Sequence, residues 1–270
     1  MKKHTAVVYM VAGLSSRFGG RIKQFARVGK NGETLIELSL EQATSVGFDK
    51  IVFIVGKMTE APFREMFGDY YNGIPIYYAH QMFDVETRDR PWGTGDALCC
   101  ARDILDCDFV VCNGDDIYGE NTFKILYEHL QKHDEDATVG YKLVDVLSQK
   151  GGVNRGMFTV SEGFVERIDE TFNITPENLI SKGLRNEEPC SQNIFALHPR
   201  VVEMLSINLE IFKKENKDDR KIEFLLSNEL SDLIKIGKIR MKIYHTPDKW
   251  IGVTNPEDEE IVREFLKNNS

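Results

Sequence analysis

The 270-residue sequence lacks any apolar run of the roughly 18 residues that a membrane-spanning helix needs. It also lacks an excess of basic residues, because 34 Lys and Arg stand against 43 Asp and Glu, a formal net charge of −9. Non-specific nucleic-acid binders carry a basic surface, so we expect neither nucleic acid nor membrane as a partner. The apolar stretch after residue 4 is broken at residues 13–17 with no small-residue cleavage site, so we expect no signal peptide and a cytoplasmic location.

Paired cysteines and clustered histidines are also missing. The six histidines are scattered without ligand spacing, and the five cysteines are odd in number and contain no Cys-x-x-Cys pair. Buried, reduced thiols are therefore favoured over disulfides or a zinc site. The cysteines are Cys99, Cys100, Cys107, Cys112 and Cys190.

Short apolar runs alternate with helical patterns over the first 135 residues. Thr34 and Glu37 form a capping-box pattern at the start of one helix. Such alternation predicts an α/β fold: a Rossmann-like, three-layer, mixed but mostly parallel sheet with helices on both faces. The expected strands are 5–11, 50–55, 74–79 and 108–112, and the expected helices follow Thr34 and span 95–105 and 121–133.

The second half is less regular. Residues 158–168 have the pattern of a hairpin with its turn at 161–163. Further strands are expected at 138–143 and 240–245, and helices at 199–213, 222–236 and 256–267.

A first motif directly follows the first strand. Residues 12–20 read Ala-Gly-Leu-Ser-Ser-Arg-Phe-Gly-Gly, and Lys23 comes soon after. Glycines let backbone N–H groups approach a phosphate, and Arg17 can bridge two phosphate oxygens. The segment is neither Gly-x-Gly-x-x-Gly nor a Walker loop, and an ordinary Gly/Ser turn is the alternative interpretation.

Two further motifs lie where an open parallel sheet binds ligands, beyond the carboxyl ends of its strands. Residues 91–97, Pro-Trp-Gly-Thr-Gly-Asp-Ala, open a helix and offer free N–H donors to a base edge or an anion, unless Trp92 simply anchors a loop. Residues 113–116, Asn-Gly-Asp-Asp, end a strand with Asp115 and Asp116, which are hard ligands suited to Mg²⁺. An Asp-rich turn before the next helix is the alternative.

Together these blocks resemble the nucleotidyltransferase superfamily that makes nucleotide-sugars. The resemblance rests on Gly13-x-Ser15-x-Arg17-Phe18-Gly19 with Lys23, on Gly93-Thr94-Gly95-x-Ala97, and on Gly114-Asp115. Blocks at 192–195, 223–226 and 248–254 extend it over nearly the whole chain, towards a poorly characterised bacterial branch. It implies a GT-A-like fold in one domain, 1–270, with a nucleotide-binding half of about 1–135 and an acceptor-binding half of about 136–270 that includes the C-terminal helix.

The resemblance also implies roles for individual residues. The triphosphate would contact Ala12, Gly13, Ser15, Arg17 and Lys23; the base Gln81, Gly93 and Thr94; the acceptor Gly152, Glu170 and Asn193. Mg²⁺ would be the cofactor, held by Asp115 with Asp116. The family adds a second metal-binding side chain near its C-terminal strand, but residues 250–255 carry no carboxylate at the aligned place, which leaves Asp248 or Asn255 as alternatives.

The implied reaction is attack by an acceptor phosphate oxygen on the α-phosphorus of a nucleoside triphosphate, with release of pyrophosphate. A phosphate monoester has a second pKa of about 6 and is anionic at neutral pH, so no general base is needed. UTP and a sugar 1-phosphate are the first expectation, and a cytidylyltransferase acting on phosphocholine or another phosphorylated alcohol is the second. A glycosyltransferase and a non-catalytic nucleotide-binding regulatory module remain as rivals.

Overall fold

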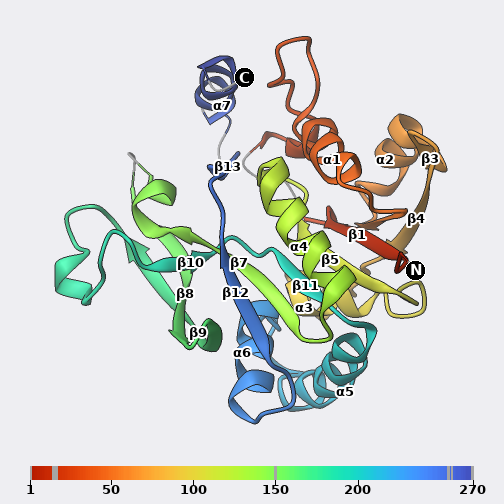
Figure 1. The fold of residues 1–270 in the computed structure, drawn as a ribbon. Coiled ribbons are helices and arrows are strands. Elements are labelled where there is room, and N and C mark those ends of the chain that lie inside the picture. Colours follow the sequence, from red (N-terminus) through yellow and green to blue (C-terminus); the bar gives the residue numbers. More distant parts are fainter. Residues whose placement is uncertain (1, 14–17, 149–150, 254–255, 257, 269–270) are drawn as a thin grey trace.

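The computed structural model describes residues 2–13, 18–148, 151–253, 256 and 258–268. One mixed sheet of 11 strands runs through both halves of the chain, in the order β3-β4-β2-β1-β5-β11-β7-β12-β9-β8-β10 (Figure 1). Its strands are β1 (Thr5–Met10), β2 (Lys50–Val55), β3 (Tyr70–Tyr71), β4 (Ile74–His80), β5 (Asp108–Asn113), β7 (Asp136–Lys142), β8 (Val153–Ser161), β9 (Phe164–Ile174), β10 (Pro189–Ser191), β11 (Phe195–Leu197) and β12 (Met241–His245).

Helices cover both faces of this sheet. On one face α1 (Leu35–Ser45), α2 (Glu60–Phe67) and α4 (Glu120–Lys132) share a buried core with alternate residues of β1, including Val7 and Tyr9. On the other face α3 (Thr94–Cys99), α5 (Pro199–Glu215) and α6 (Leu226–Lys235) pack on the intervening residues, including Ala6 and Val8. Two apolar faces per strand are what a sheet buried between helices requires, so the predicted three-layer α/β class is confirmed.

The parallel core is the part that the sequence predicted best. Strands β4, β2, β1 and β5 are parallel neighbours, and β7 is parallel to β12. The capping box is also present, because the Thr34 side chain accepts from the Glu37 amide while the Glu37 carboxylate accepts from the Thr34 amide. Strand β11 is antiparallel to both β5 and β7, which makes the sheet mixed.

Two expected helices are shorter than their patterns. The helix expected at 95–105 is α3, which ends at Cys99 and continues as turns. The helix expected at 222–236 begins only at Leu226, because the Phe224 amide donates to the Trp92 carbonyl and its carbonyl accepts from Gly95. Backbone paired with another segment in this way cannot also be helical.

A second, two-stranded sheet joins the C-terminal region to the parallel core. Its strands are β6 (Asp116–Ile117) and β13 (Ile251–Gly252), and the chain then ends in α7 (Asp258–Asn268). Within the described ranges, no helix combines the length and the apolar character of a membrane span.

Candidate active site

The carboxyl ends of β1 and β5 lie level with each other. Met10 of β1 pairs with Asn113 of β5, and the Gly114 amide then donates to the Met10 carbonyl at 3.2 Å. A side chain at Gly114 would collide with Val11, so only glycine permits this close approach. The sharp passage from β5 sets Asp115 beside the loop that follows β1.

Lys23 reaches Asp115 from that loop. It opens a short 3-10 turn, Lys23–Phe25, and its ammonium group forms a hydrogen-bonded ion pair with the Asp115 carboxylate. Both side chains are largely shielded from water, at 24% and 20% exposed, where opposite charges attract more strongly than in bulk solvent. The two blocks that the sequence assigned to the triphosphate and the metal are therefore in direct contact.

The glycines of the loop after β1 face open space. A Cβ atom added at Gly13, Gly19 or Gly20 would have no described atom within 4 Å. Gly13 is exposed and Ala12 half-buried, so the backbone at the head of the loop is accessible to an anion. The predicted contacts Ser15 and Arg17 lie outside the described residues.

Asp116 lies next to Asp115 but is buried, at 5% exposed. One of its carboxylate oxygens accepts from the Asn113 side-chain amide at 2.9 Å and from the Tyr118 hydroxyl at 3.1 Å. Burial, and secondly the negative charge of Asp115, raise the pKa of Asp116 to about 7, although these hydrogen bonds and Lys23 act in the opposite direction. The repulsion between these two neighbouring carboxyl groups is what a divalent cation would relieve.

Gly252 explains why the expected C-terminal carboxylate is absent. It pairs with Asp116 across the β6–β13 ribbon, and a Cβ atom there would collide with the other Asp116 oxygen. The two positions therefore compete for one space, which Asp116 fills. Asp248, an alternative ligand, instead caps α4: its oxygens accept from the Asn121 side chain and the Thr122 amide, both at 2.9 Å. Asn255 lies outside the described residues.

The ligand types present fit Mg²⁺. This ion commonly takes one or two carboxylates from a protein and completes its shell with water and substrate phosphates. Asp115 and Asp116 supply two adjacent carboxyl groups, and no cluster of three or more His, Cys, Asp or Glu that could hold a metal occurs in the described part of the chain.

The block expected to face the base is held by neighbouring segments. Gln81 is buried, and its side-chain amide donates to the Gly93 carbonyl at 2.9 Å and to Asp96 at 2.8 Å. Gly93, at φ 108°, would bring a Cβ atom to 2.7 Å from the Phe224 carbonyl. The Thr94 hydroxyl accepts from the Leu226 amide at 3.0 Å, at the start of α6. Contacts with residues 224–226 thus explain why positions 93 and 94 are glycine and threonine. That Gln81, Gly93 and Thr94 contact the base stays a prediction.

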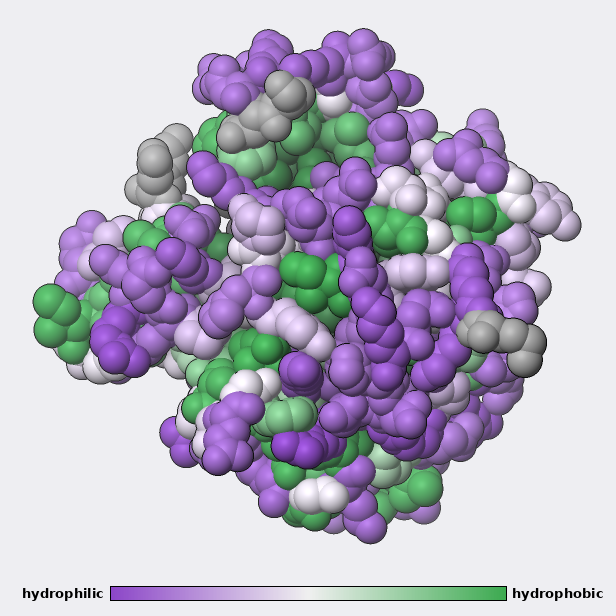
Figure 2. Space-filling view, viewed as in Figure 1, coloured by the Kyte–Doolittle hydropathy of each residue, from purple (hydrophilic) through white to green (hydrophobic). Residues whose placement is uncertain are grey.

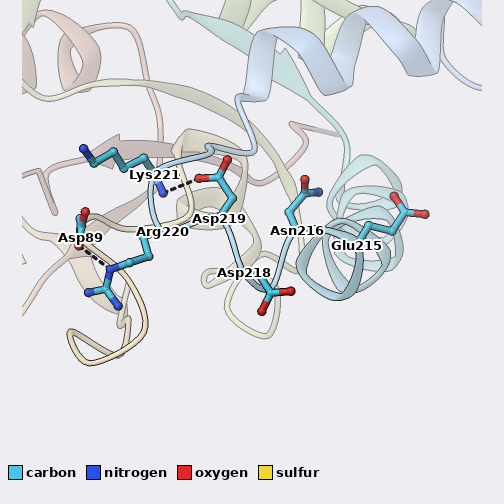
Figure 3. A pocket seen from close by; sticks show the side chains of 7 residues that line it. All are labelled: Asp89, Glu215, Asn216, Asp218, Asp219, Arg220 and Lys221. Atoms are coloured by element: carbon cyan, nitrogen blue, oxygen red, sulfur yellow. Dashed lines mark hydrogen bonds and ion pairs between the residues drawn. The ribbon is translucent and has the colours of Figure 1, made fainter.

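Arg88 connects the loop before residues 91–97 to the segment 219–222. Its buried guanidinium donates to the backbone carbonyls of Asp219 at 2.6 Å and Ile222 at 2.5 Å, and it stacks on Trp92 at 3.6 Å. A depression of about 590 Å³ lies alongside, lined by Asp89, Glu215, Asn216, Asp218, Asp219, Arg220 and Lys221 (Figure 3). None of the predicted site residues lines it, so we assign it no part in the chemistry.

The expected acceptor residues are only partly brought together. Glu170 of β9 pairs with Gly156 of β8, and Gly156 pairs with Ser191 of β10, two residues before Asn193. Ser227 donates to Glu170 at 2.9 Å. Gly152 is exposed and lies beyond the far end of this register, where it packs against Asn173. The geometry therefore places Gly156, rather than the expected Gly152, beside Glu170.

Sequence reasoning missed Arg155 and Trp250. The Arg155 guanidinium donates to the backbone carbonyls of Asn154 at 3.0 Å and Val146 at 2.8 Å, while its Nε is buried without a partner. Burial lowers the pKa of Arg155, opposed in part by the charges of Asp116 and Glu170. The guanidinium lies 5.1 Å from the centre of the Trp250 ring, whose Nε1 is also buried and unpartnered. A lone arginine on a strand carries no sequence signal of this kind, because its contacts with Val146 and Trp250 come from other parts of the chain.

Known proteins share this architecture. A profile described as nucleotidyl transferase matches residues 19–229. A UTP–glucose-1-phosphate uridylyltransferase from Haloferax volcanii is 26% identical over 160 residues, which span 59% of this chain but only 61% of that enzyme.

Solved structures agree over almost the full length. A UDP-glucose pyrophosphorylase complexed with UDP-glucose superposes with a TM-score of 0.68 at 17% identity, covering 99% of this chain and 100% of that one. An inositol-1-phosphate CTP transferase from T. maritima gives a TM-score of 0.67 at 14% identity, covering 100% and 98%. The structural matches establish the fold, and the profile match over most of the sequence establishes that the chain belongs to the nucleotidyl transferase family.

Proposed function

We propose that the chain joins a nucleoside triphosphate, preferentially UTP, to a sugar 1-phosphate and releases pyrophosphate. The observation that carries the proposal is the contact between Lys23 and Asp115, which unites a cation beside a glycine-rich loop with a pair of carboxylates. A bond would form between the acceptor phosphate oxygen and the α-phosphorus while the bond from the α-phosphorus to the departing pyrophosphate breaks. The difficulty of this reaction is bringing anions together, so positioning and charge neutralisation are the expected means of catalysis.

In this proposal the first half of the chain, about 1–135, binds the nucleotide. Ala12, Gly13, Ser15, Arg17 and Lys23 contact the triphosphate, and Gln81, Gly93 and Thr94 the base. Lys23 exchanges its Asp115 partner for phosphate oxygens and neutralises the leaving pyrophosphate. Asp115 and Asp116 would hold Mg²⁺, which would neutralise charge on the reacting phosphates.

The second half, about 136–270, receives the acceptor. Glu170 and Asn193 contact the sugar, and Gly156 lets Glu170 and Ser191 lie close together, since a Cβ atom there would lie 3.3 Å from the Glu170 carboxylate and 3.4 Å from Ser191. Arg155 contacts the acceptor phosphate, because its partly buried guanidinium donates to backbone carbonyls and keeps a buried Nε without a hydrogen-bond partner. A partly buried positive charge of this kind is stabilised by an anion. Gly152 lies just before β8, beside Asn173, and its contact with the sugar stays a prediction.

A matrix of nucleoside triphosphates against phosphorylated acceptors, read by pyrophosphate release, tests the proposal. UTP with glucose 1-phosphate or a similar hexose 1-phosphate should react fastest. CTP with phosphocholine or another phosphorylated alcohol would instead identify a cytidylyltransferase. Nucleotide binding without product for any acceptor would support a regulatory module, and glycosyl transfer from a nucleotide-sugar without pyrophosphate would support a glycosyltransferase.

The predicted role of Asp116 as a metal ligand can be tested by moving its carboxylate to position 252. Asp116→Ala should weaken Mn²⁺ binding and activity, and adding Gly252→Asp to that variant should restore part of both, because the two side chains compete for the same space. Gly252→Asp alone should be poorly tolerated. Unchanged Mn²⁺ affinity in Asp116→Ala would remove Asp116 from the ligand set.

A further inference from the structure

A third, small apolar core connects the elements of the candidate active site. It is separate from the two large cores on the faces of the sheet. Its buried members come from the loop after β1, from α1, from β6, from the segment after β13 and from α7: Phe18, Ala26, Val28, Leu35, Ile117, Val253 and Val262. Phe18 and Ala26 flank the Lys23 turn in sequence. Ile117 directly follows the Asp115-Asp116 pair. Packing in this core therefore bears directly on the distance between Lys23 and the carboxylate pair.

Helix α7 closes this core from outside the sheet. At the top of Figure 1 it lies beside the loop between β1 and α1. The space-filling view shows apolar residues gathered directly beneath this polar helix (Figure 2). Val262 is completely buried and Leu266 partly buried against the core, whereas the adjacent Ile261 is 55% exposed.

Polar contacts tie α7 to the same loop. Glu259 of α7 forms an ion pair, at 3.4 Å, with Arg21, which lies two residues before Lys23. Arg263 donates to the Arg27 carbonyl at 3.1 Å. The ion pair and this hydrogen bond thus bracket the Lys23 turn on both sides, with Val262 between their two helix residues.

We propose that α7 is an intramolecular brace that holds the Lys23 turn against Asp115, and that Val262 is its principal positioning residue. The inference rests on the proposed role of Lys23 in binding the triphosphate. Among the described residues, α7 contributes to this small core and not to the two large cores of the sheet, so it can detach locally while the large cores stay folded. Detachment removes one wall of the core around the Lys23 turn, so nucleotide binding weakens while acceptor binding does not.

A matched pair of substitutions on α7 tests this inference. Val262→Asp places a charge in the core, and Ile261→Asp places the same charge on the exposed side of the same helix. Amide hydrogen exchange of the substrate-free protein should accelerate at least tenfold over residues 18–28 in Val262→Asp, with β1, β5 and β12 unchanged. The KM for the triphosphate should rise at least tenfold and the KM for the acceptor should stay within twofold. Ile261→Asp should match the unaltered protein in every measurement.

Several results would overturn the brace. Among them are unchanged exchange over 18–28, an unchanged triphosphate KM despite faster exchange, and equal effects of the two substitutions. If Val262→Asp does not fold, Val262→Thr and Ile261→Thr, which change size little, carry the same comparison with a threefold threshold. Lys23→Ala measured alongside separates the two claims: faster exchange in Val262→Asp with normal turnover in Lys23→Ala would reject the role of Lys23 while leaving the docking of α7 intact.

Discussion

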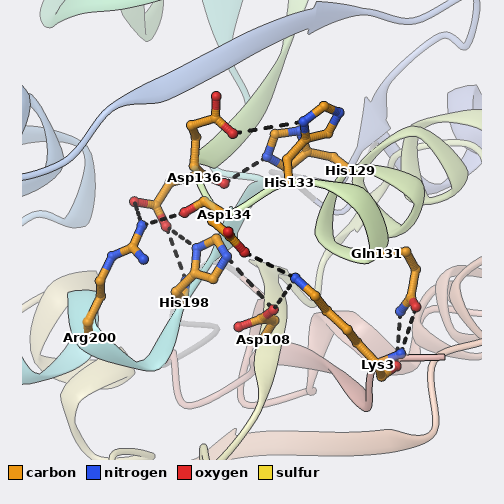
Figure 4. Close-up of polar contacts among 10 residues, drawn as sticks. Lys3, Asp108, His129, Gln131, His133, Asp134, Asp136, His198 and Arg200 are labelled. Atoms are coloured by element: carbon orange, nitrogen blue, oxygen red, sulfur yellow. Dashed lines mark hydrogen bonds and ion pairs between the residues drawn. The ribbon is translucent and has the colours of Figure 1, made fainter. Parts of the chain in front are cut away.

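The two ends of the central strands differ in how their charges are partnered. At the amino ends, Asp136 is completely buried and accepts from the His198 amide at 3.1 Å and lies 2.9 Å from the His198 ring (Figure 4). The other Asp136 oxygen lies 3.7 Å from Arg200, and the second ring nitrogen of His198 lies 3.8 Å from Asp108. Lys3 in turn lies 3.7 Å from Asp108. Each ionisable side chain in this network lies within ion-pair distance of a group that can carry the opposite charge.

At the carboxyl ends the charges are left incompletely matched. The Lys23 ammonium pairs with Asp115, and burial together with the charge of Asp115 raises the pKa of the adjacent Asp116 to about 7. Arg155 has a buried nitrogen without a partner, and the glycines after β1 border open space. Charges that pair within the protein contribute to stability, even though Asp136 Oδ2 and His198 Nε2 make no hydrogen bond within the described residues. Charge left without an opposite charge beside open space is instead what a ligand completes. The contrast thus separates substitutions that affect turnover from those that affect folding.

The largest effect should come from Lys23→Ala and Asp115→Ala. Each should lower turnover by about 100-fold or more, because single electrostatic groups in active sites contribute on that scale. Both variants should stay folded, because neither side chain belongs to one of the buried apolar cores. Pyrophosphate release and thermal unfolding measure the two properties, with Lys30→Ala, an exposed lysine of the same loop region, as control. Near-normal turnover in both variants would disprove the site.

At the opposite end, His198→Ala should destabilise the fold by about 3 kcal/mol, because it leaves the buried Asp136 carboxylate without its nearest partner. Turnover of the folded protein should stay within twofold. Urea unfolding and steady-state kinetics test this, and His4→Ala is the control, since its side chain is 88% exposed. A large loss of turnover with normal stability would contradict the division between the two ends.

Arg155→Gln should raise the acceptor KM by about tenfold, the scale of one charge-assisted hydrogen bond. The triphosphate KM should not change. Arg167→Gln serves as control, because the Arg167 side chain is 55% exposed and forms an ion pair with Asp169, which is also exposed. An equal effect of both substitutions, or a change in the triphosphate KM alone, would place Arg155 outside the acceptor site.

The smallest effect concerns a carboxyl group that is not among the predicted site residues. Burial, and then Asp232, raise the pKa of Glu229 in α6 to about 7. The folded state therefore holds this proton more tightly than the unfolded chain, so the stabilisation is complete below about pH 4 and is lost as pH rises through 7. Since the group is half-exposed, the contribution should be on the order of 1 kcal/mol.

The protein should lose stability between pH 5 and pH 8 partly because Glu229 gives up its proton. Glu229→Gln should consequently make this loss of stability smaller. Thermal unfolding at the two pH values measures the effect, which corresponds to a few degrees in a domain of this size. Turnover should be unaffected. Identical pH dependence of the melting temperature with and without the substitution would show that Glu229 has an ordinary pKa.

Much of the nucleotide half was predictable because its signals are local. Strand 50–55 follows from a continuous run of β-branched and apolar residues, and the start of α1 from Thr34 and Glu37, which hydrogen-bond within one turn. The approach of Lys23 to Asp115 followed from one further rule, that parallel strands end at the same edge of the sheet. None of these predictions requires knowing which distant residue a given side chain contacts.

The acceptor half was less predictable because its features depend on register between strands. Gly152 and Gly156 are both glycines of one strand region, and only the pairing of β8 with β9 puts Gly156 beside Glu170. Strand β11 is only three residues long, too short for a periodic pattern, yet it separates β5 from β7. The late start of α6 likewise depends on hydrogen bonds to residues 92 and 95, over 120 positions away.

By itself the sequence determined the α/β class, the parallel core and the two blocks that meet at the strand ends, because short-range patterns and strand polarity suffice for these. Only the tertiary structure decided that Gly252 leaves its space to Asp116, that Asp248 caps a helix, and that α7 closes the core beside Lys23. These arrangements arise from steric exclusion and packing between residues more than 100 positions apart, and no local pattern encodes which distant side chain will occupy a given volume.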